Sequence, residues 1–297
     1  MFTKNQATDF FIKLQNDICY ALEQADGNAK FQEDKWERDE GGGGRTRVLQ
    51  NGNVIEKGGV NFSAVYGKLP DNIKKALKVD EEDFFATGVS IVMHPENPFV
   101  PIIHMNVRYF ELSEKNRWFG GGIDLTPHYI NIEQAKYFHK QLKNTCDKFD
   151  PEYYPKFKKW ADEYFFIKHR GEARGIGGIF FDRLSNNSTK TIDEIFEFVK
   201  AVGETFVPTY CHLIELNKKT PYTQQHKNWQ MVRRGRYVEF NLVYDKGTKF
   251  GLDTNGRIES ILMSLPLQAG WPYNFIPQPD SPEEFTTNLL KNPINWI

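Results

Sequence analysis

The middle of the chain alternates apolar and polar residues with a period of two. From Val89 to Met93 the odd positions are apolar, whereas Ser90 and His94 share the other side. The stretch from Ile103 to Tyr109 alternates more sharply. Because successive side chains of a β-strand point to opposite faces, this pattern predicts strands with one apolar and one polar face. The short connection at 95–98 predicts that the two strands are antiparallel neighbours.

Further strand signals occur on both sides of this region, and Asn-Gly dipeptides mark two turns. Such dipeptides favour tight hairpins, so Asn51-Gly52 and Asn255-Gly256 are each expected to join two strands. Strands are expected at residues 46–50, 53–56, 60–66, 84–94, 101–111, 118–125, 176–181, 236–244 and 257–265.

Helical spacing of apolar residues, together with capping signals, predicts helices between the strand blocks. Thr191 and Glu194 form a capping box that opens a long helix, within which Pro208 predicts a kink. Gly235 is expected to end the helix before it. Helices are expected near residues 10–22, at 132–149, 155–169 and 222–234, and from 191 and 281 onward.

The order of these elements favours an α+β fold with a mainly antiparallel sheet over regular parallel βαβ units. No repeat and no linker-like stretch divides the 297 residues, so a single domain spanning 1–297 is expected. The run Gly41 to Gly44 predicts a mobile or tightly approached loop. It is a poor phosphate cradle because no Gly-Lys-Ser/Thr follows it.

Composition and charge exclude several classes of partner. Lys and Arg number 38 against 39 acidic residues, so no long-range field favours nucleic acid or an anionic membrane. No apolar run approaches the roughly 18–20 residues that a membrane-spanning helix needs. The cysteines, Cys19, Cys146 and Cys211, show no CxxC spacing, and the N-terminus shows no signal or transit pattern. A reducing, cytoplasmic location is expected.

The polar faces of the central strands carry the candidate chemistry. A solvated sheet face would be expected to carry Lys, Glu, Thr and Gln. The residues found instead are types that bind anions, transfer protons and orient substrates, which favours a functional cleft over a merely solvated face. They are Ser90, His94, His104, Asn106, Arg108 and Asp124.

Histidines outside these strands allow a metal site. His139 lies on the inner stripe of its expected helix, and His169 lies near a helix end. With His94 and His104 they could form a four-histidine site, although no HExxH spacing supports it. A hydrogen-bonded structural role for each histidine is the competing interpretation.

Arginines beside glycines or on expected strands suit fork-like recognition of carboxylates. Arg108, on the polar strand face, is the strongest candidate, and a solvated surface role is the alternative for the others. A nearly neutral chain with local arginine clusters suits a small polyanion better than nucleic acid. The arginines concerned are Arg45, Arg47, Arg108, Arg174, Arg233, Arg234, Arg236 and Arg257.

Motifs along nearly the whole chain match one family in order. They are Gly41 to Val48, Glu56 to Ser63, His104 to Phe110, Trp118 to Pro127, Gly175 to Asp182, Tyr237 to Asp245 and Glu259 to Pro266. In these segments the chain resembles the oxygen-dependent coproporphyrinogen III oxidases. It departs from the family pattern at Ala173, where Arg is frequent, and at Arg183, where Asp is frequent.

The resemblance implies a single domain with a large antiparallel sheet flanked by helices on both faces. It implies a homodimer whose interface includes Tyr237 to Trp271, and a deep cleft around the substrate. The implied enzyme converts two propionates of coproporphyrinogen III into vinyl groups, giving protoporphyrinogen IX. O2 is the electron acceptor and CO2 and H2O2 are released, with no organic cofactor. A divalent metal is an open question.

The resemblance also assigns roles to residues. His104 would be an acid/base group, and the family's bacterial members suggest His94, His104, His139 and His169 as metal ligands. Our hypothesis is that Asp124 accepts hydrogen bonds from pyrrole N–H groups while Arg108 holds a carboxylate. Substrate contacts are implied for Ser90, Asn106, Val107, Arg108, Asn255, Gly256 and Arg257.

Two other functions stay open at this point. One is a metal-dependent oxygenase or hydrolase built on the four histidines. The other is a tetrapyrrole-binding carrier that performs no chemistry.

Overall fold

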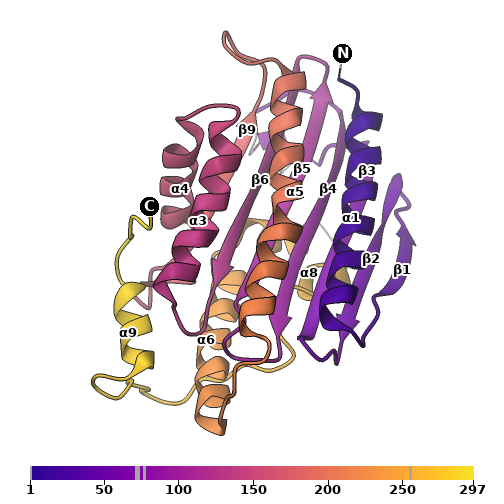
Figure 1. Ribbon diagram of the computed structural model, residues 1–297. Helices are drawn as coiled ribbons and strands as arrows, with labels where there is room; N and C mark the ends of the chain where they lie inside the picture. The colour runs from indigo at the N-terminus through magenta and orange to yellow at the C-terminus, as the bar shows by residue number, and fades with distance from the viewer. Residues whose placement is uncertain (1, 71–73, 76–77, 254–255) are drawn as a thin grey trace.

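A seven-stranded sheet forms the centre of the molecule (Figure 1). The computed structural model describes residues 2–70, 74–75, 78–253 and 256–297. All neighbouring strands of the sheet are antiparallel, in the order β1-β2-β3-β4-β5-β6-β9. The strands are β1 (Gln32–Glu37), β2 (Gly42–Gln50), β3 (Ile55–Lys68), β4 (Asp83–Pro95), β5 (Ile102–Ser113), β6 (Asn116–Thr126) and β9 (Gly178–Leu184). Two short strands, β7 (Phe166–Ile167) and β8 (Glu172–Ala173), pair separately.

Helices cover both faces of the sheet, which confirms the predicted α+β class. In Figure 1 one layer of helices lies in front of the sheet, and two later helices, α6 and α8, lie behind it. The front layer comprises α1 (Lys4–Asp26), α3 (Ile132–Asp147), α4 (Tyr153–Tyr164) and α5 (Ile192–Asn217). The later helices are α6 (Gln224–Val243), α7 (Lys246–Asp253), α8 (Ile258–Leu262) and α9 (Pro282–Leu289).

The front layer exists because one face of the sheet is apolar. Ile91, Met105 and Val107 are fully buried there in the same cluster as Phe11 and Phe206 of the helices. Removing each such side chain from water contributes about 1.5–3 kcal/mol. The strand parity inferred from the sequence therefore identified the face that carries the core.

Capping and turn signals account for several element ends. The predicted capping box at Thr191 and Glu194 starts α5. The β2–β3 hairpin is also confirmed, but its tip lies beyond the Asn-Gly pair, since the Gly52 N–H donates to the Ile55 carbonyl at 2.9 Å. The Asp26 carboxylate accepts from the amides of the loop, including that of Val54 at 2.8 Å.

The predicted second hairpin is wrong. Residues 236–244 belong mostly to α6, which continues through Gly235 instead of ending there, and residues 257–265 contain α8. Residues 236–244 are rich in types that favour strands, yet α6 buries Arg233, Tyr237 and Phe240 at helical spacing. A side chain at Gly235 would approach the Gly270 carbonyl to 2.6 Å, so glycine here serves close packing. Asn255 lies outside the described residues.

The glycine run at 41–44 is also not a free loop, because Gly42 to Gly44 open β2. A Cβ on Gly43 or Gly44 would collide with backbone carbonyl groups of the adjacent strands. The structure also contains β1, which the sequence pattern did not predict, and α4 ends before the expected position 169. Within the described ranges no helix is long and apolar enough to cross a membrane. All three cysteines are free.

Candidate active site

Strand register brings most of the predicted polar residues onto one face of the sheet. Ser90 of β4 pairs with Asn106 of β5, and His104 of β5 pairs with Asp124 of β6. Arg108 follows on the same side of β5, because it is two residues from Asn106. The side of the sheet facing α6 and α8 therefore carries the residues expected to act together.

Glycines form the backbone around Arg108. It stands between Gly88 of β4 and Gly120 of β6 in the register. Its Nη1 donates to Asn106 Oδ1 at 2.8 Å and its Nη2 to Asp182 Oδ1 at 2.9 Å. A side chain at Gly120 would collide with the Asp182 carboxylate, so the ion pair needs glycine beneath it. The guanidinium is thereby held in place while its side chain stays 38% exposed.

A linear polar network starts beside this pair. His104 Nδ1 donates to Asp124 Oδ1 at 2.7 Å, and Arg174 Nη2 donates to Asp124 Oδ2 at 2.7 Å. Arg174 Nη1 donates onward to Asn241 Oδ1 at 2.8 Å. Exposure falls along the network, from 22% for the His104 side chain to 2% for Asp124. His104 is thus the member nearest to solvent.

The carboxylate at the centre of this network is buried and charged. Burial alone would raise the pKa of the Asp124 carboxyl, but the Arg174 charge and the His104 hydrogen bond outweigh it and hold that pKa below its ordinary value. The Arg174 guanidinium lies 4.4–4.7 Å from the ring centroids of Phe165, Tyr237 and Phe240. Cation–π contacts of this kind help to compensate for the loss of water. Asp124 therefore stays ionised beneath His104.

The α8 segment contacts the same face over β2 and β3. Thr46 Oγ1 and Ser260 Oγ are 2.7 Å apart, and Asn61 Nδ2 donates to the Ser260 carbonyl at 2.7 Å. Arg257 Nη1 donates to Ser260 Oγ at 3.3 Å, and Arg257 also pairs with Asp34. Gly256 forms a backbone hydrogen bond to Gly251. The predicted contacts Gly256 and Arg257 thus belong to a segment that borders the site.

Comparison with known proteins shows to which family the chain belongs. The model of the family described as coproporphyrinogen III oxidase matches residues 6–296. The chain belongs to this family.

Curated relatives extend the agreement over nearly all of the chain. Coproporphyrinogen-III oxidase 1, chloroplastic, of Arabidopsis thaliana is 50% identical over 95% of this chain and 76% of its own length. The mitochondrial oxygen-dependent coproporphyrinogen-III oxidase of Rattus norvegicus is 52% identical over 96% of this chain and 67% of its own length. The chloroplastic oxygen-dependent enzyme of Glycine max is 50% identical over 95% and 77%.

The structure does not bring the four predicted metal ligands, His94, His104, His139 and His169, together. His94 Nε2 lies 2.8 Å from the Ser264 carbonyl, and His169 Nε2 lies 2.8 Å from Glu239. His139 is buried in the α3 layer, where it bonds to Tyr154 and to the Ile176 carbonyl. Each histidine has its own partner, as a structural histidine does. Across the described ranges no three His, Cys, Asp or Glu side chains gather in a metal-binding arrangement.

Two further predictions about the candidate site need correction. The Val107 side chain is fully buried on the apolar face, so only its backbone can contribute to the candidate site. His94 is on the expected strand but fully buried under α6 and α8, where burial, aided by the Arg234 charge, holds its pKa well below the ordinary value. It anchors the Ser264 carbonyl and is not part of an open cleft.

The structure adds residues that the sequence pattern did not single out. Arg174 was one arginine among several, and no local signal distinguished it. Asp182 and Asn241 are brought to the site from β9 and α6, far away in the sequence. Their contacts depend on tertiary structure, so only the polar types and the neighbouring glycines could have suggested them.

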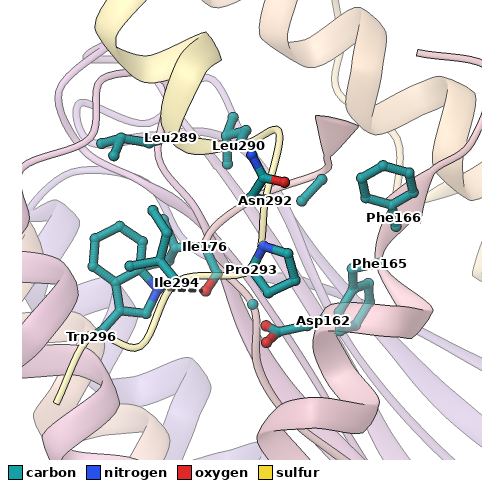
Figure 2. A pocket seen from close by; sticks show the side chains of 13 residues that line it. Asp162, Phe165, Phe166, Ile176, Leu289, Leu290, Asn292, Pro293, Ile294 and Trp296 are labelled. Atoms are coloured by element: carbon teal, nitrogen blue, oxygen red, sulfur yellow. Dashed lines mark hydrogen bonds between the residues drawn. The ribbon is translucent and has the colours of Figure 1, made fainter. Parts of the chain in front are cut away.

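A separate cavity lies beside the C-terminal segment (Figure 2). Asp162, Phe165, Leu290 and Trp296 are among its lining residues. Figure 2 shows the hydrogen bond from Trp296 Nε1 to the Ile176 carbonyl, which ties the chain end to the segment following Arg174. The cavity contains none of the predicted site residues, and we assign it no part in the chemistry.

Proposed function

We propose that this chain catalyses the oxidative decarboxylation of two propionates of coproporphyrinogen III to vinyl groups, giving protoporphyrinogen IX. The observation that carries the proposal is a half-buried His104 bonded to the ionised Asp124 on the same sheet face as Arg108. Membership of the family and the names of the relatives supply the substrate.

The reaction balances without an organic cofactor. For each propionate, the C–H bond at the carbon attached to the pyrrole ring breaks, as does the bond to the carboxylate. A C=C bond forms and CO2 leaves. The remaining two electrons reduce O2, which takes up two protons to become H2O2. The electron-rich tetrapyrrole is therefore the reductant and O2 the co-substrate.

The chain's residues supply binding and proton transfer. Arg108 is suited to bind a propionate carboxylate, since a guanidinium matches that group with two parallel hydrogen bonds. Asn106 and Ser90 extend the polar face beside it. Because Asp124 fixes Nδ1 of His104, the other ring nitrogen, Nε2, is the group suited to transfer protons.

The structure changes our hypothesis for Asp124. A carboxylate that is 2% exposed, with one oxygen bonded to His104 and the other to Arg174, is poorly placed to meet pyrrole N–H groups. Asp124 therefore acts on His104, whose ring it orients. Since the four histidines do not meet, no metal-dependent step is derived.

Assays on coproporphyrinogen III with and without O2 test the proposal. The purified protein should release two CO2 per protoporphyrinogen formed in air, with matching H2O2, and none under argon. A chelator should leave the rate unchanged. Binding without CO2 release in air would instead identify a carrier, and loss of the rate with the chelator would favour a metal-dependent oxygenase.

The homodimer is a second part of the proposal. Between Tyr237 and Trp271 the chain exposes several large apolar side chains, which favours an interface there. They are Leu242, Val243, Leu252, Ile258, Leu267 and Trp271. Sedimentation should give the mass of two chains, and a Leu242→Glu/Ile258→Glu variant should sediment as one. A wild-type monomer at micromolar concentration would contradict this part. The cytoplasmic location stays a prediction, which fractionation of the source cells can test.

A further inference from the structure

Strand β9 departs from regular pairing opposite Gly120. Its Phe181 pairs with Gly121 and its Leu184 with Phe119, so two residues of β9 face one residue of β6. The second of them, Arg183, has a φ of 53°, in the left-handed region that non-glycine residues rarely adopt. This is a β-bulge, a feature that redirects side chains at sheet edges and near active sites.

The bulge turns two consecutive side chains toward the same face. In a regular strand Asp182 and Arg183 would point to opposite sides of the sheet. Here Asp182 bonds to Arg108, and the Arg183 guanidinium carbon lies 5.7 Å from the centroid of the Trp118 ring. Trp118 alternates along β6 with Gly120, so both contacts lie on the face of the candidate site.

Trp118 belongs to a row of stacked rings. Its ring stacks on Phe110 at a centroid distance of 4.8 Å, and Phe110 stacks on Phe84 at 5.9 Å with an interplanar angle of 11°. We call Phe84, Phe110 and Trp118 the aromatic shelf. All three are half-buried. Phe110 lies two residues after Arg108 on the same face of β5. The aromatic shelf therefore extends the candidate site beyond Arg108, in the direction away from His104.

The arginines beside the aromatic shelf differ in whether a carboxylate of the protein already pairs with them. Arg108 is already bound to Asp182 and Asn106, and Arg38, which lies over Phe84, pairs with Glu40. Arg183 is exposed, and the side-chain contact found for it among the described residues is with the Trp118 ring and not with a carboxylate. At this end of the site it is the guanidinium whose charge a ligand carboxylate could meet without displacing a protein group.

We infer that Arg183 is a second carboxylate-binding residue of the site, holding a propionate that is not at the reacting position while the aromatic shelf contacts the adjoining pyrrole edge. The inference rests on the proposed function, because coproporphyrinogen III carries four propionates on an apolar ring system. A carboxylate bound by Arg183 would leave His104, and the N–H groups of Arg108 that Asn106 and Asp182 do not use, for the propionate that reacts. Since Arg183 is remote from His104 along the face, it contributes to binding and not to bond breaking.

Kinetics of Arg183→Ala and Arg183→Lys test the inference, with Lys140→Ala as the control. Lys140 is an exposed cation on α3, in the opposite layer, so its loss changes net charge equally. Arg183→Ala should raise KM for coproporphyrinogen III by about 3- to 10-fold with kcat within twofold, as expected for a partly exposed carboxylate contact. Arg183→Lys should fall between Arg183→Ala and the wild type, and Lys140→Ala should match the wild type.

A binding measurement keeps the test independent of turnover. Titration of the wild type and variants with coproporphyrin III, the oxidised tetracarboxylate, should show the same loss of affinity in Arg183→Ala. The dicarboxylate protoporphyrin IX should show a smaller loss. Equal behaviour of Arg183→Ala and Lys140→Ala in both assays, or a fall in kcat at constant KM, would overturn the inference. An inactive wild type would instead contradict the proposed function and leave the titration to decide the role of Arg183.

Discussion

The two faces of the central sheet are built from the same strands and differ by one residue in register. On the front face Ile91, Met105 and Ile123 are paired and fully buried under the helices. On the opposite face the next residues along, Ser90 and Asn106, are half-buried and polar. A shift of one residue therefore changes a side chain's role from packing to chemistry.

The contrast also concerns how each face is stabilised. The front face depends on apolar burial, which is non-directional and roughly proportional to the apolar area removed from water. The site face depends on directed contacts between charged groups, of which the pair Asp124 and Arg174 is the most buried. Substitutions on the two faces should therefore have different effects on stability and on activity.

Breaking the buried pair should have the largest effect on stability. Arg174→Gln or Asp124→Asn leaves its buried partner without a counter-charge, which costs about 3–5 kcal/mol in the free energy of unfolding. The double variant removes both charges and should be less destabilised than the sum of the single variants. Urea unfolding of all four proteins measures this. Additive losses would show that the two groups are not coupled.

Substitutions at two adjacent positions of β5 should have different effects, because the two side chains lie on opposite faces of the sheet. Met105→Ala removes a fully buried side chain and should cost about 2–5 kcal/mol, while the folded fraction keeps its kcat. Asn106→Ala should cost about 1 kcal/mol or less, because the side chain is half-buried, but should lower kcat/KM. If Met105→Ala lowered activity but not stability, and Asn106→Ala lowered stability but not kcat/KM, the proposed difference between the two faces would be refuted.

The front layer should also show the acid sensitivity of a buried histidine. Burial lowers the pKa of His139 to about 3. An unfolded histidine titrates near 6.5, so the stabilisation is present above about pH 6.5 and is lost as the pH falls from there toward 3, by up to about 1.4 kcal/mol per pH unit. In His139→Gln the free energy of unfolding should decline less steeply over this range. His212→Gln, an exposed histidine of α5, is the control and should keep the wild-type slope.

The smallest expected effect concerns the orientation of Arg108. Asp182→Asn keeps a hydrogen-bond acceptor near Arg108 Nη2 but removes the charge. Because both side chains are partly exposed, stability should change by less than about 1 kcal/mol, while KM for coproporphyrinogen III changes severalfold. An unchanged KM would show that Asn106 alone positions the guanidinium.

Strand parity was sufficient to predict the central fold and much of the site. Alternation in β4 and β5 predicts that Ser90, His104, Asn106 and Arg108 share one face, and the register of the two strands agrees. It could not reveal Arg174 or Asp182, because these residues reach the site from segments that are distant in sequence. Nor could it show that the four histidines lie in separate environments.

The C-terminal third shows where local pattern fails. Residues 236–244 are rich in aromatic and β-branched types and imitate a strand, but packing on the sheet selects a helix. Because neither of the two flanking segments forms a strand, the second hairpin is not found in the described residues. Burial of side chains at helical spacing therefore outweighed the local strand propensity of this segment.

We propose that His104, supported by Asp124, transfers protons in the reaction while contributing little to the fold. The most direct test is His104→Gln, since the 22% exposed histidine can be removed while Asp124 keeps Arg174 as its partner. We expect kcat for coproporphyrinogen III to fall by about 10²- to 10⁴-fold, with the free energy of unfolding changed by about 1 kcal/mol or less. A kcat within a few-fold of the wild type would contradict the account.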